Sequence, residues 1–188
     1  MTRTAAVVLA AGAGTRFTGP GAKLLATLRD KPLVVWAVEH AMEAGLDEVI
    51  VVVGGGIEVA RALPAGTTVV RNDRWAGGIA TSLAAGIGAA RAGGHGAVVV
   101  GLGDQPFVEA GAWRAVAACE ETPIAVATYD GERGNPVRLA AAVWRGLPVL
   151  GDQGARLLFR DRPELVTEVP CPGSSVDIDT VEDLAAWS

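Results

Sequence analysis

The chain is poor in the residues that usually carry redox, zinc or covalent chemistry. Of its 188 residues, two are cysteine and two are histidine. Cys119 and Cys171 lie far apart, without CxxC spacing or a nearby histidine, so the sequence favours two buried free thiols over a disulfide or a zinc site. His40 and His95 match no motif, and no Ser-His-Asp or Cys-His arrangement indicates covalent catalysis.

The chain also lacks a positive charge excess and a long hydrophobic run. Its formal net charge is −5, whereas binding along a phosphate backbone needs a basic surface, so general nucleic-acid binding is excluded. The opening apolar run ends after Ala11, which is too short to cross a bilayer, and it lacks the layout of a signal peptide. We therefore expect a cytoplasmic protein with no membrane and no nucleic-acid partner.

What is present is an ordinary globular composition, with 50% hydrophobic and 20% charged residues. A chain of this length predicts one domain over residues 1–188. Short apolar runs typical of buried strands alternate with helical segments. We expect strands at residues 5–9, 48–53, 67–70, 97–102, 124–128 and 165–169, and helices at 32–44, 78–92, 110–118, 140–145, 155–159 and from 181.

Strands that are apolar throughout and alternate with helices predict an α/β fold, a three-layer, doubly wound and mostly parallel sheet. Ligands in such sheets bind beyond the carboxyl ends of the strands. The loops after Leu9, Val70 and Leu102 are therefore the places where a site is expected.

The first of these loops has the composition of a phosphate-binding loop. Small residues follow the first strand and are succeeded by two cations, Arg16 and Lys23. Backbone donors with two cations suit a triphosphate, although a glycine-rich turn with solvated basic residues is the alternative. The loop is neither a P-loop nor a GxGxxG dinucleotide fingerprint, because no GK[ST] follows and Ala10 and Ala11 interrupt the glycines.

Carboxylates occupy two other places suited to a metal ion. Asp104 directly follows an apolar strand, where it can either hold Mg²⁺ against phosphate oxygens or cap the next helix. Near the C-terminus, Asp177 and Asp179 would face the same side of an extended segment, although Asp179 or Thr180 can also serve as a helix cap.

The motif LAAGxGxR followed by lysine resembles the signature of nucleotidyltransferases with a GT-A-like, Rossmann-like fold. The resemblance implies that Arg16 and Lys23 act on the triphosphate, that Asp104 is catalytic, and that Asp104, Asp177 and Asp179 bind Mg²⁺. Residues 71–83 resemble the base-facing NxxWxxGMxxSL segment of molybdenum cofactor cytidylyltransferases. The expected nucleotide-binding residues are Leu9, Ala10, Ala11, Gly12, Gly14, Arg16, Lys23, Gly77 and Ser82.

Two further segments resemble the same MobA-like family. Residues 131–136 resemble its GxRGHP motif, with Asn135 in place of histidine, and residues 151–156 resemble its GDxGAR motif. Without the resemblance, the first would be interpreted as a turn before a strand and the second as a helix start capped by Asp152. With it, the expected acceptor-binding residues are Arg133, Gly134, Asn135, Asp152 and Arg156.

The resemblance covers the whole chain and implies an Mg²⁺-dependent enzyme that transfers CMP from CTP to the phosphate of molybdopterin, with pyrophosphate released. A guanylyltransferase acting on molybdopterin, phospholactate or phosphoenolpyruvate is an alternative, although Leu9-Ala10-Ala11-Gly12 favours CTP over the LAGG loop of molybdopterin guanylyltransferases. A non-catalytic chaperone that delivers cofactor to a molybdenum hydroxylase is a second alternative. A hydroxylase partner is also possible for the enzyme itself.

Overall fold

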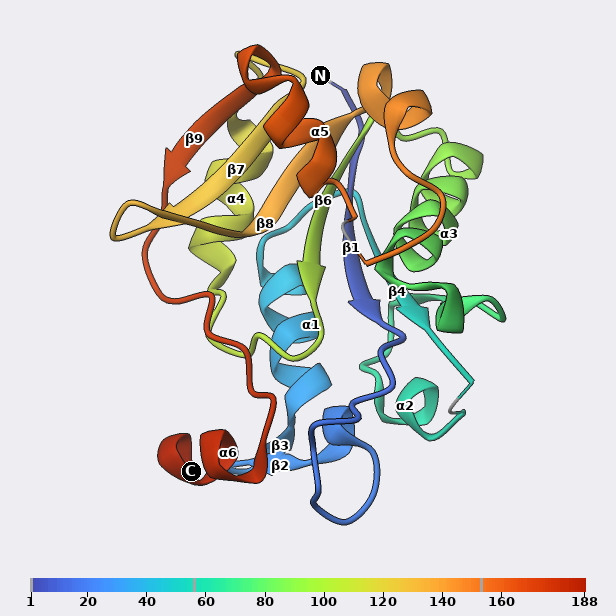
Figure 1. Ribbon diagram of the computed structural model, residues 1–188, viewed down its shortest axis with the longest axis vertical. Coiled ribbons are helices and arrows are strands. Elements are labelled where there is room, and N and C mark those ends of the chain that lie inside the picture. The colour runs from blue at the N-terminus through green and yellow to red at the C-terminus, as the bar shows by residue number, and fades with distance from the viewer. Residues whose placement is uncertain (1, 56, 153) are drawn as a thin grey trace.

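The computed structural model describes residues 2–55, 57–152 and 154–188 and has a seven-stranded sheet at its centre (Figure 1). The strand order is β5-β4-β1-β6-β8-β7-β9. The strands are β1 (Thr4–Ala10), β4 (Glu48–Val53), β5 (Thr68–Arg71), β6 (Ala97–Leu102), β7 (Ile124–Tyr129), β8 (Glu132–Ala140) and β9 (Val166–Pro170). The helices are α1 (Leu33–Glu43), α2 (Ile57–Ala62), α3 (Ile79–Ala92), α4 (Ala110–Ala118), α5 (Arg156–Asp161) and α6 (Val181–Trp187).

The central strand β1 is buried on both faces and separates two hydrophobic cores. Ala6 and Val8 point into a core that is completed by α1 and α4, whereas Ala5 and Val7 point into a core completed by α3 and α5. Successive side chains of a strand face opposite sides, so an all-apolar strand needs a cover on each face. The three-layer, mostly parallel α/β fold predicted from the sequence is thus confirmed.

The helices begin and end close to where the sequence predicts. In α1, the buried residues Leu33, Val34, Ala37, Val38 and Ala41 form one stripe against the sheet. The helix ends before Gly45, whose φ of 72° places it in the left-handed conformation typical of a helix terminus. Pro32 lies just outside the helix, as its N-cap residue, rather than in its first turn.

Strand β8 is the main departure from the expected fold. The strands expected from the sequence do not include residues 132–140, which pair antiparallel with β7 and, through residues 137–140, also with β6 in the middle of the sheet. Proline is rare in central strands because it cannot donate a ladder hydrogen bond. Here the register jumps from Val126–Val137 to Ala127–Gly134, so Asn135 and Pro136 form a bulge and need no partner.

The structure adds elements that the sequence did not predict. These are helix α2, the hairpin β2–β3 (Thr27–Leu28 and Lys31–Pro32) and the 3₁₀ turns η1 (Lys23–Leu25), η2 (Trp75–Gly77) and η4 (Pro163–Leu165). The 3₁₀ turn η3 (Ala141–Gly146), by contrast, corresponds to the short helical segment expected at residues 140–145. A third apolar cluster of Leu28, Leu33 and Ile178 joins this hairpin to the C-terminal segment, with Leu184 of α6 packed against it. Figure 1 accordingly shows α6 beside the hairpin. In the described ranges, no helix combines the length and apolar character needed to cross a bilayer.

Candidate active site

The loop after β1 folds back so that Lys23 lies at the carboxyl edge of the sheet. Gly14 has a φ of 60°, and a Cβ atom added to it would lie 2.9 Å from the Cβ of Lys23. The turn is closed by a 3.0 Å hydrogen bond in which the Phe17 amide donates to the Gly14 carbonyl. Glycine is therefore required at position 14 both for its backbone conformation and for the close approach of Lys23.

Lys23 joins the two acidic segments that the sequence proposed as metal ligands. Its Nζ lies 2.5 Å from Asp104 Oδ2 and 2.8 Å from Asp179 Oδ1, and the side chain is only 9% exposed. Arg16 Nη1 lies 2.8 Å from the other oxygen of Asp179, but its side chain is 74% exposed. Burial lowers the pKa of Lys23, but Asp104 and Asp179 outweigh this effect, so the net pKa is raised and the ammonium stays charged.

The C-terminal segment is held against β6 by its backbone. The Ile178 amide donates to the Asp104 carbonyl at 3.0 Å, and the Ile178 side chain is fully buried. Thr180 and Asp183 then form a reciprocal capping box at the start of α6, so Thr180, not Asp179, is the cap. This leaves the Asp179 carboxylate available to Lys23 and Arg16.

Asp177 and Asp179 flank the buried Ile178 in a segment that is not part of a strand. Whereas Asp179 pairs with Lys23, Asp177 lines the larger of the pockets described below. The Asp177 residue as a whole is exposed, but its carboxyl group is partly desolvated. This desolvation is the larger cause, and the negative charge of Asp104 the smaller cause, of a raised pKa at Asp177. The cluster therefore has more negative charge than Lys23 neutralises.

This donor set is compatible with a hard divalent cation. Asp104, Asp177 and Asp179 offer only carboxylate oxygens, which are the ligands that Mg²⁺ prefers, and a cation would relieve the repulsion that raises the pKa of Asp177. Among the described residues, however, no three His, Cys, Asp or Glu side chains converge closely enough to be recognised as a metal site. Lys23 lies between two of the three carboxylates instead.

A pocket of about 480 Å³ lies over the first loop. Six of the expected nucleotide-binding residues line it, namely Leu9, Ala11, Gly12, Gly14, Lys23 and Ser82. Ala10, Arg16 and Gly77 are not part of its lining: Ala10 is buried in β1, and Arg16 is paired outside with Asp179. Asp104 completes the wall, so the lysine–aspartate cluster opens into this pocket.

The loop after β5 supplies the opposite wall of this smaller pocket. Trp75 lines the pocket and also packs closely over Gly54: a Cβ added to Gly54 would lie 3.2 Å from the indole ring. The loop is held by Asn72, which is 5% exposed and donates to Thr81 Oγ1 at 2.8 Å and to Ser82 Oγ at 3.0 Å. Asn72 is not among the site residues expected from the sequence.

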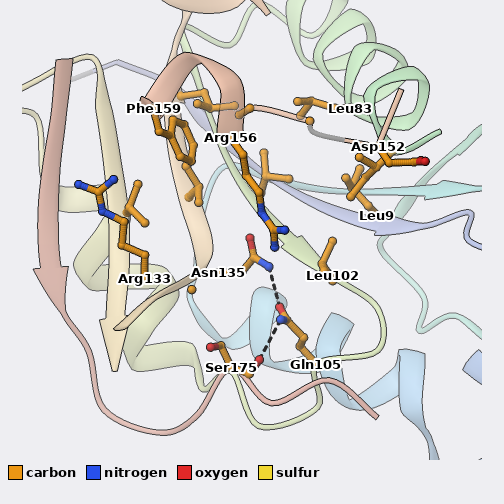
Figure 2. Close-up of a pocket in the computed structure, with 18 of the residues that line it drawn as sticks. Leu9, Leu83, Leu102, Gln105, Arg133, Asn135, Asp152, Arg156, Phe159 and Ser175 are labelled. Atoms are coloured by element: carbon orange, nitrogen blue, oxygen red, sulfur yellow. Dashed lines mark hydrogen bonds between the residues drawn. The ribbon is translucent and has the colours of Figure 1, made fainter. Parts of the chain in front are cut away.

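A second pocket, of about 630 Å³, adjoins the first, and all five expected acceptor-binding residues line it: Arg133, Gly134, Asn135, Asp152 and Arg156. Figure 2 shows the Arg156 side chain extending from α5 into this pocket toward Asn135, between apolar side chains that include Leu102 and Phe159. Arg133 pairs through its Nε with Glu168 at 2.7 Å. Within the GDxGAR segment, Gln153 lies outside the described residues.

A chain of amides forms the floor of the larger pocket (Figure 2). Asn135 donates to Gln105 Oε1 at 2.9 Å, and Gln105 donates to the Ser175 carbonyl at 2.9 Å. Gln105 is only 4% exposed. The β8 bulge, the end of β6 and the acidic C-terminal segment are therefore tied together by Gln105, which follows Asp104 directly and was not assigned a role from the sequence.

The two pockets share a wall at Leu9, Ile79, Leu102 and Asp152. This wall is built by close backbone contact: the Gly151 amide donates to the Gly77 carbonyl at 2.9 Å, and the Ala80 amide donates to the Gly151 carbonyl at 3.0 Å. Gly78 has a φ of 95°, and an added Cβ would lie 2.5 Å from the Gly151 backbone. The two pockets thus lie side by side, with Lys23 and Asp104 lining the smaller one and Asp177 lining the larger one.

Comparison with known proteins agrees with this geometry. Residues 6–166 match the family model of the MobA-like NTP transferase domain. The chain belongs to this family. It is therefore a nucleotidyltransferase with the mostly parallel, Rossmann-like fold of such enzymes.

Similar proteins cover nearly the whole of this MobA-like transferase. The nicotine blue oxidoreductase of Paenarthrobacter nicotinovorans is 34% identical, over 95% of this chain and 93% of its own length. A nucleotidyl transferase from Methanothermobacter thermautotroptrophicus has a TM-score of 0.85 at 27% identity, over 98% of this chain and 95% of its own. Rv0371C of Mycobacterium tuberculosis, solved in complex with manganese, has a TM-score of 0.81 at 30% identity, over 99% of this chain and 98% of its own.

Proposed function

We propose that this MobA-like transferase transfers CMP from CTP to the phosphate of molybdopterin and releases pyrophosphate. The observation that carries the proposal is the pair of adjoining pockets with the Lys23–Asp104–Asp179 cluster between the phosphate loop and the acidic C-terminal segment. In this proposal the smaller pocket binds CTP and the larger one binds the acceptor. Reactants held side by side no longer need to meet by diffusion, which accounts for a large part of such catalysis.

In the proposed reaction, an acceptor phosphate oxygen attacks the α-phosphorus of CTP. A bond forms between this oxygen and the α-phosphorus, the bond to the β-phosphate oxygen breaks, and pyrophosphate leaves with the electron pair. Lys23 neutralises charge on the departing pyrophosphate, and Arg16, whose exposed side chain can swing inward, adds a second cation. Asp104, Asp177 and Asp179 would hold Mg²⁺, which supplies further charge neutralisation at the phosphates.

The proposed preference for CTP depends on the first loop. Ala11 lines the smaller pocket and is only 7% exposed, so its methyl group reduces the space for a base relative to glycine. A purine needs more room than a pyrimidine. Ala11→Gly should therefore shift the ratio of kcat/KM values for CTP and GTP toward GTP.

The larger pocket is compatible with a flat heterocyclic acceptor that has polar edges. Its walls include Leu83, Val126 and Phe159, while Arg156 and Asn135 supply a cation and an amide. An arginine can bind a phosphate with two hydrogen bonds, and an amide can recognise a heterocycle edge. In a molybdenum-cofactor pathway, the product would be delivered to a molybdenum hydroxylase partner.

A second candidate function is dye reduction. The observation that favours it is the 34% identity, over nearly the full length of both chains, to a protein named nicotine blue oxidoreductase. Under this hypothesis, the larger pocket holds the conjugated dye and the smaller one a reduced nicotinamide nucleotide that supplies the electrons. The lysine–aspartate cluster favours the transferase hypothesis, because hydride transfer needs no set of three carboxylates.

The deciding experiment incubates the purified protein with Mg²⁺, each of the four NTPs and molybdopterin, phospholactate or phosphoenolpyruvate, and measures pyrophosphate. We expect the largest release with CTP and molybdopterin. Faster turnover of GTP would refute the cytidylyltransferase assignment. Absence of pyrophosphate with every pair, together with NADH or NADPH oxidation in the presence of a quinoid dye, would establish the reductase instead.

A further inference from the structure

Two neighbouring hydroxyl groups at the start of α3 differ in their hydrogen bonding. Thr81 and Ser82 are 1% and 4% exposed, and both accept a hydrogen bond from Asn72 Nδ2. Thr81 Oγ1 also lies 2.9 Å from the Gly78 carbonyl and 3.0 Å from the Arg74 carbonyl, so its own hydrogen has an acceptor. In the described part of the chain, the Ser82 hydroxyl hydrogen has none.

The orientation of the Asn72 amide is determined by a backbone group that can only donate. The Arg74 amide donates to Asn72 Oδ1 at 3.0 Å, so the oxygen of Asn72 must face Arg74 and its NH₂ group must face the two hydroxyls. The backbone of Asn72 is also held in place, because its backbone amide donates to the Val53 carbonyl at 2.8 Å. Because Asn72 donates to Ser82, a lone pair of Ser82 Oγ is occupied on the protein side.

Ser82 lines the smaller pocket, and a buried hydroxyl without an acceptor is costly. We propose that Asn72 is a positioning residue that makes Ser82 a hydrogen-bond donor toward the nucleotide base. The base edge at Ser82 must then present an acceptor, as the O2 and N3 atoms of cytosine do. This inference rests on the proposed function, since it assumes that the smaller pocket binds an NTP.

The test compares each protein's affinity for CTP with its affinity for ribose 5-triphosphate, which has the same phosphates but no base. Isothermal titration calorimetry in Mg²⁺ gives the two Kd values. The Kd for ribose 5-triphosphate divided by the Kd for CTP is the ratio that isolates the contribution of the base. Any general effect of a substitution on triphosphate binding cancels in this ratio. In Ser82→Ala the ratio should fall by about tenfold, as expected for the loss of one buried hydrogen bond.

Asn72→Asp tests the positioning role with an isosteric change. A carboxylate oxygen replaces the NH₂ group, so the Ser82 hydroxyl turns to donate to residue 72 while Arg74 retains its acceptor. The ratio should fall as far as in Ser82→Ala. Thr81→Val is the matched control: it removes the other hydroxyl bonded to Asn72 and should leave the ratio at the wild-type value.

A ratio that is unchanged in Ser82→Ala or in Asn72→Asp, or that falls equally in Thr81→Val, overturns the proposal. If Asn72→Asp lowers the thermal midpoint, all ratios are measured at a temperature at which every variant is folded. A wild-type preference for GTP would refute only the cytidylyltransferase assignment. The same comparison, with GTP in place of CTP against ribose 5-triphosphate, would still test Ser82. Equal affinity of the wild type for all NTPs and for ribose 5-triphosphate would refute a base contact here.

Discussion

Gly78→Ala should destabilise the protein because two separate effects act at one residue. Gly78 has a φ of 95°, and an added Cβ would lie 2.5 Å from the carbonyl carbon and oxygen of Gly151 and 2.6 Å from Asp152 Oδ1. Forcing a side chain into the left-handed region costs about 1–2 kcal/mol. Moving Gly151 away also breaks the backbone hydrogen bonds that it forms with Gly77 and Ala80, at about 1 kcal/mol each.

Together these effects should lower the free energy of unfolding by about 3–4 kcal/mol. For a chain of this size, this corresponds to a decrease in Tm of roughly 6–15 °C. Circular dichroism during heating measures the decrease. Hydrogen exchange should also become faster at the Gly151 and Ala80 amides, because these two amides donate the hydrogen bonds that are lost.

Gly88→Ala is the matched control in the same helix. Gly88 is exposed, and a Cβ added there meets nothing within 4 Å, so this substitution should stabilise α3 by about 0.5–1 kcal/mol. A Gly78→Ala protein whose Tm equals or exceeds that of Gly88→Ala would refute the close backbone contact between the two pocket walls. A lower Tm with unchanged exchange at the Gly151 and Ala80 amides would place the damage elsewhere.

Three further predictions concern the charged cluster. Asp104→Asn should nearly abolish pyrophosphate release and weaken Mn²⁺ binding in calorimetry while the protein still folds; wild-type-like turnover in Mg²⁺ would exclude Asp104 from the site. Lys23→Ala should lower kcat by about 10²-fold or more, with a smaller loss for the exposed Arg16→Ala, whereas a change in KM alone would indicate uniform binding. The folded-state pKa of Asp177 is raised, so ionisation of Asp177 destabilises the fold as pH rises through that pKa. In EDTA, Asp177→Asn should therefore raise Tm at pH 7. This gain should vanish below the ordinary pKa of 3.8, and a gain that persists there would refute the electrostatic cause.

Most of the fold was predictable because its signals are local. The strands Glu48–Val53 and Ala97–Leu102 are continuous apolar runs, and their alternation with helices leaves few arrangements besides a covered parallel sheet. Strand β8 was missed because Pro136 and Gly134 disfavour a central strand when they are considered locally. Only pairing with β6 and β7 creates the bulge that accommodates them.

The residues of the candidate site were likewise predictable only where their signals are local. Arg16, Lys23, Asp104 and Asp179 were named from short motifs, because the chemistry of a phosphate loop or a carboxylate after a strand is visible in a few adjacent residues. The roles of Asn72 and Gln105 were not, because each depends on bonds to segments that come together only in the folded chain.

The sequence by itself determined the sheet type, the glycine-rich first loop with its two cations and which carboxylates were available. The tertiary structure alone decided that Lys23 lies between Asp104 and Asp179, which are 81 and 156 residues away along the chain, and that Asp177 lines the neighbouring pocket instead. The physical reason is that residue types and short spacings determine local conformation and available chemistry. Distances between side chains from different elements depend on sheet order, on register and on which glycines allow two backbones to touch.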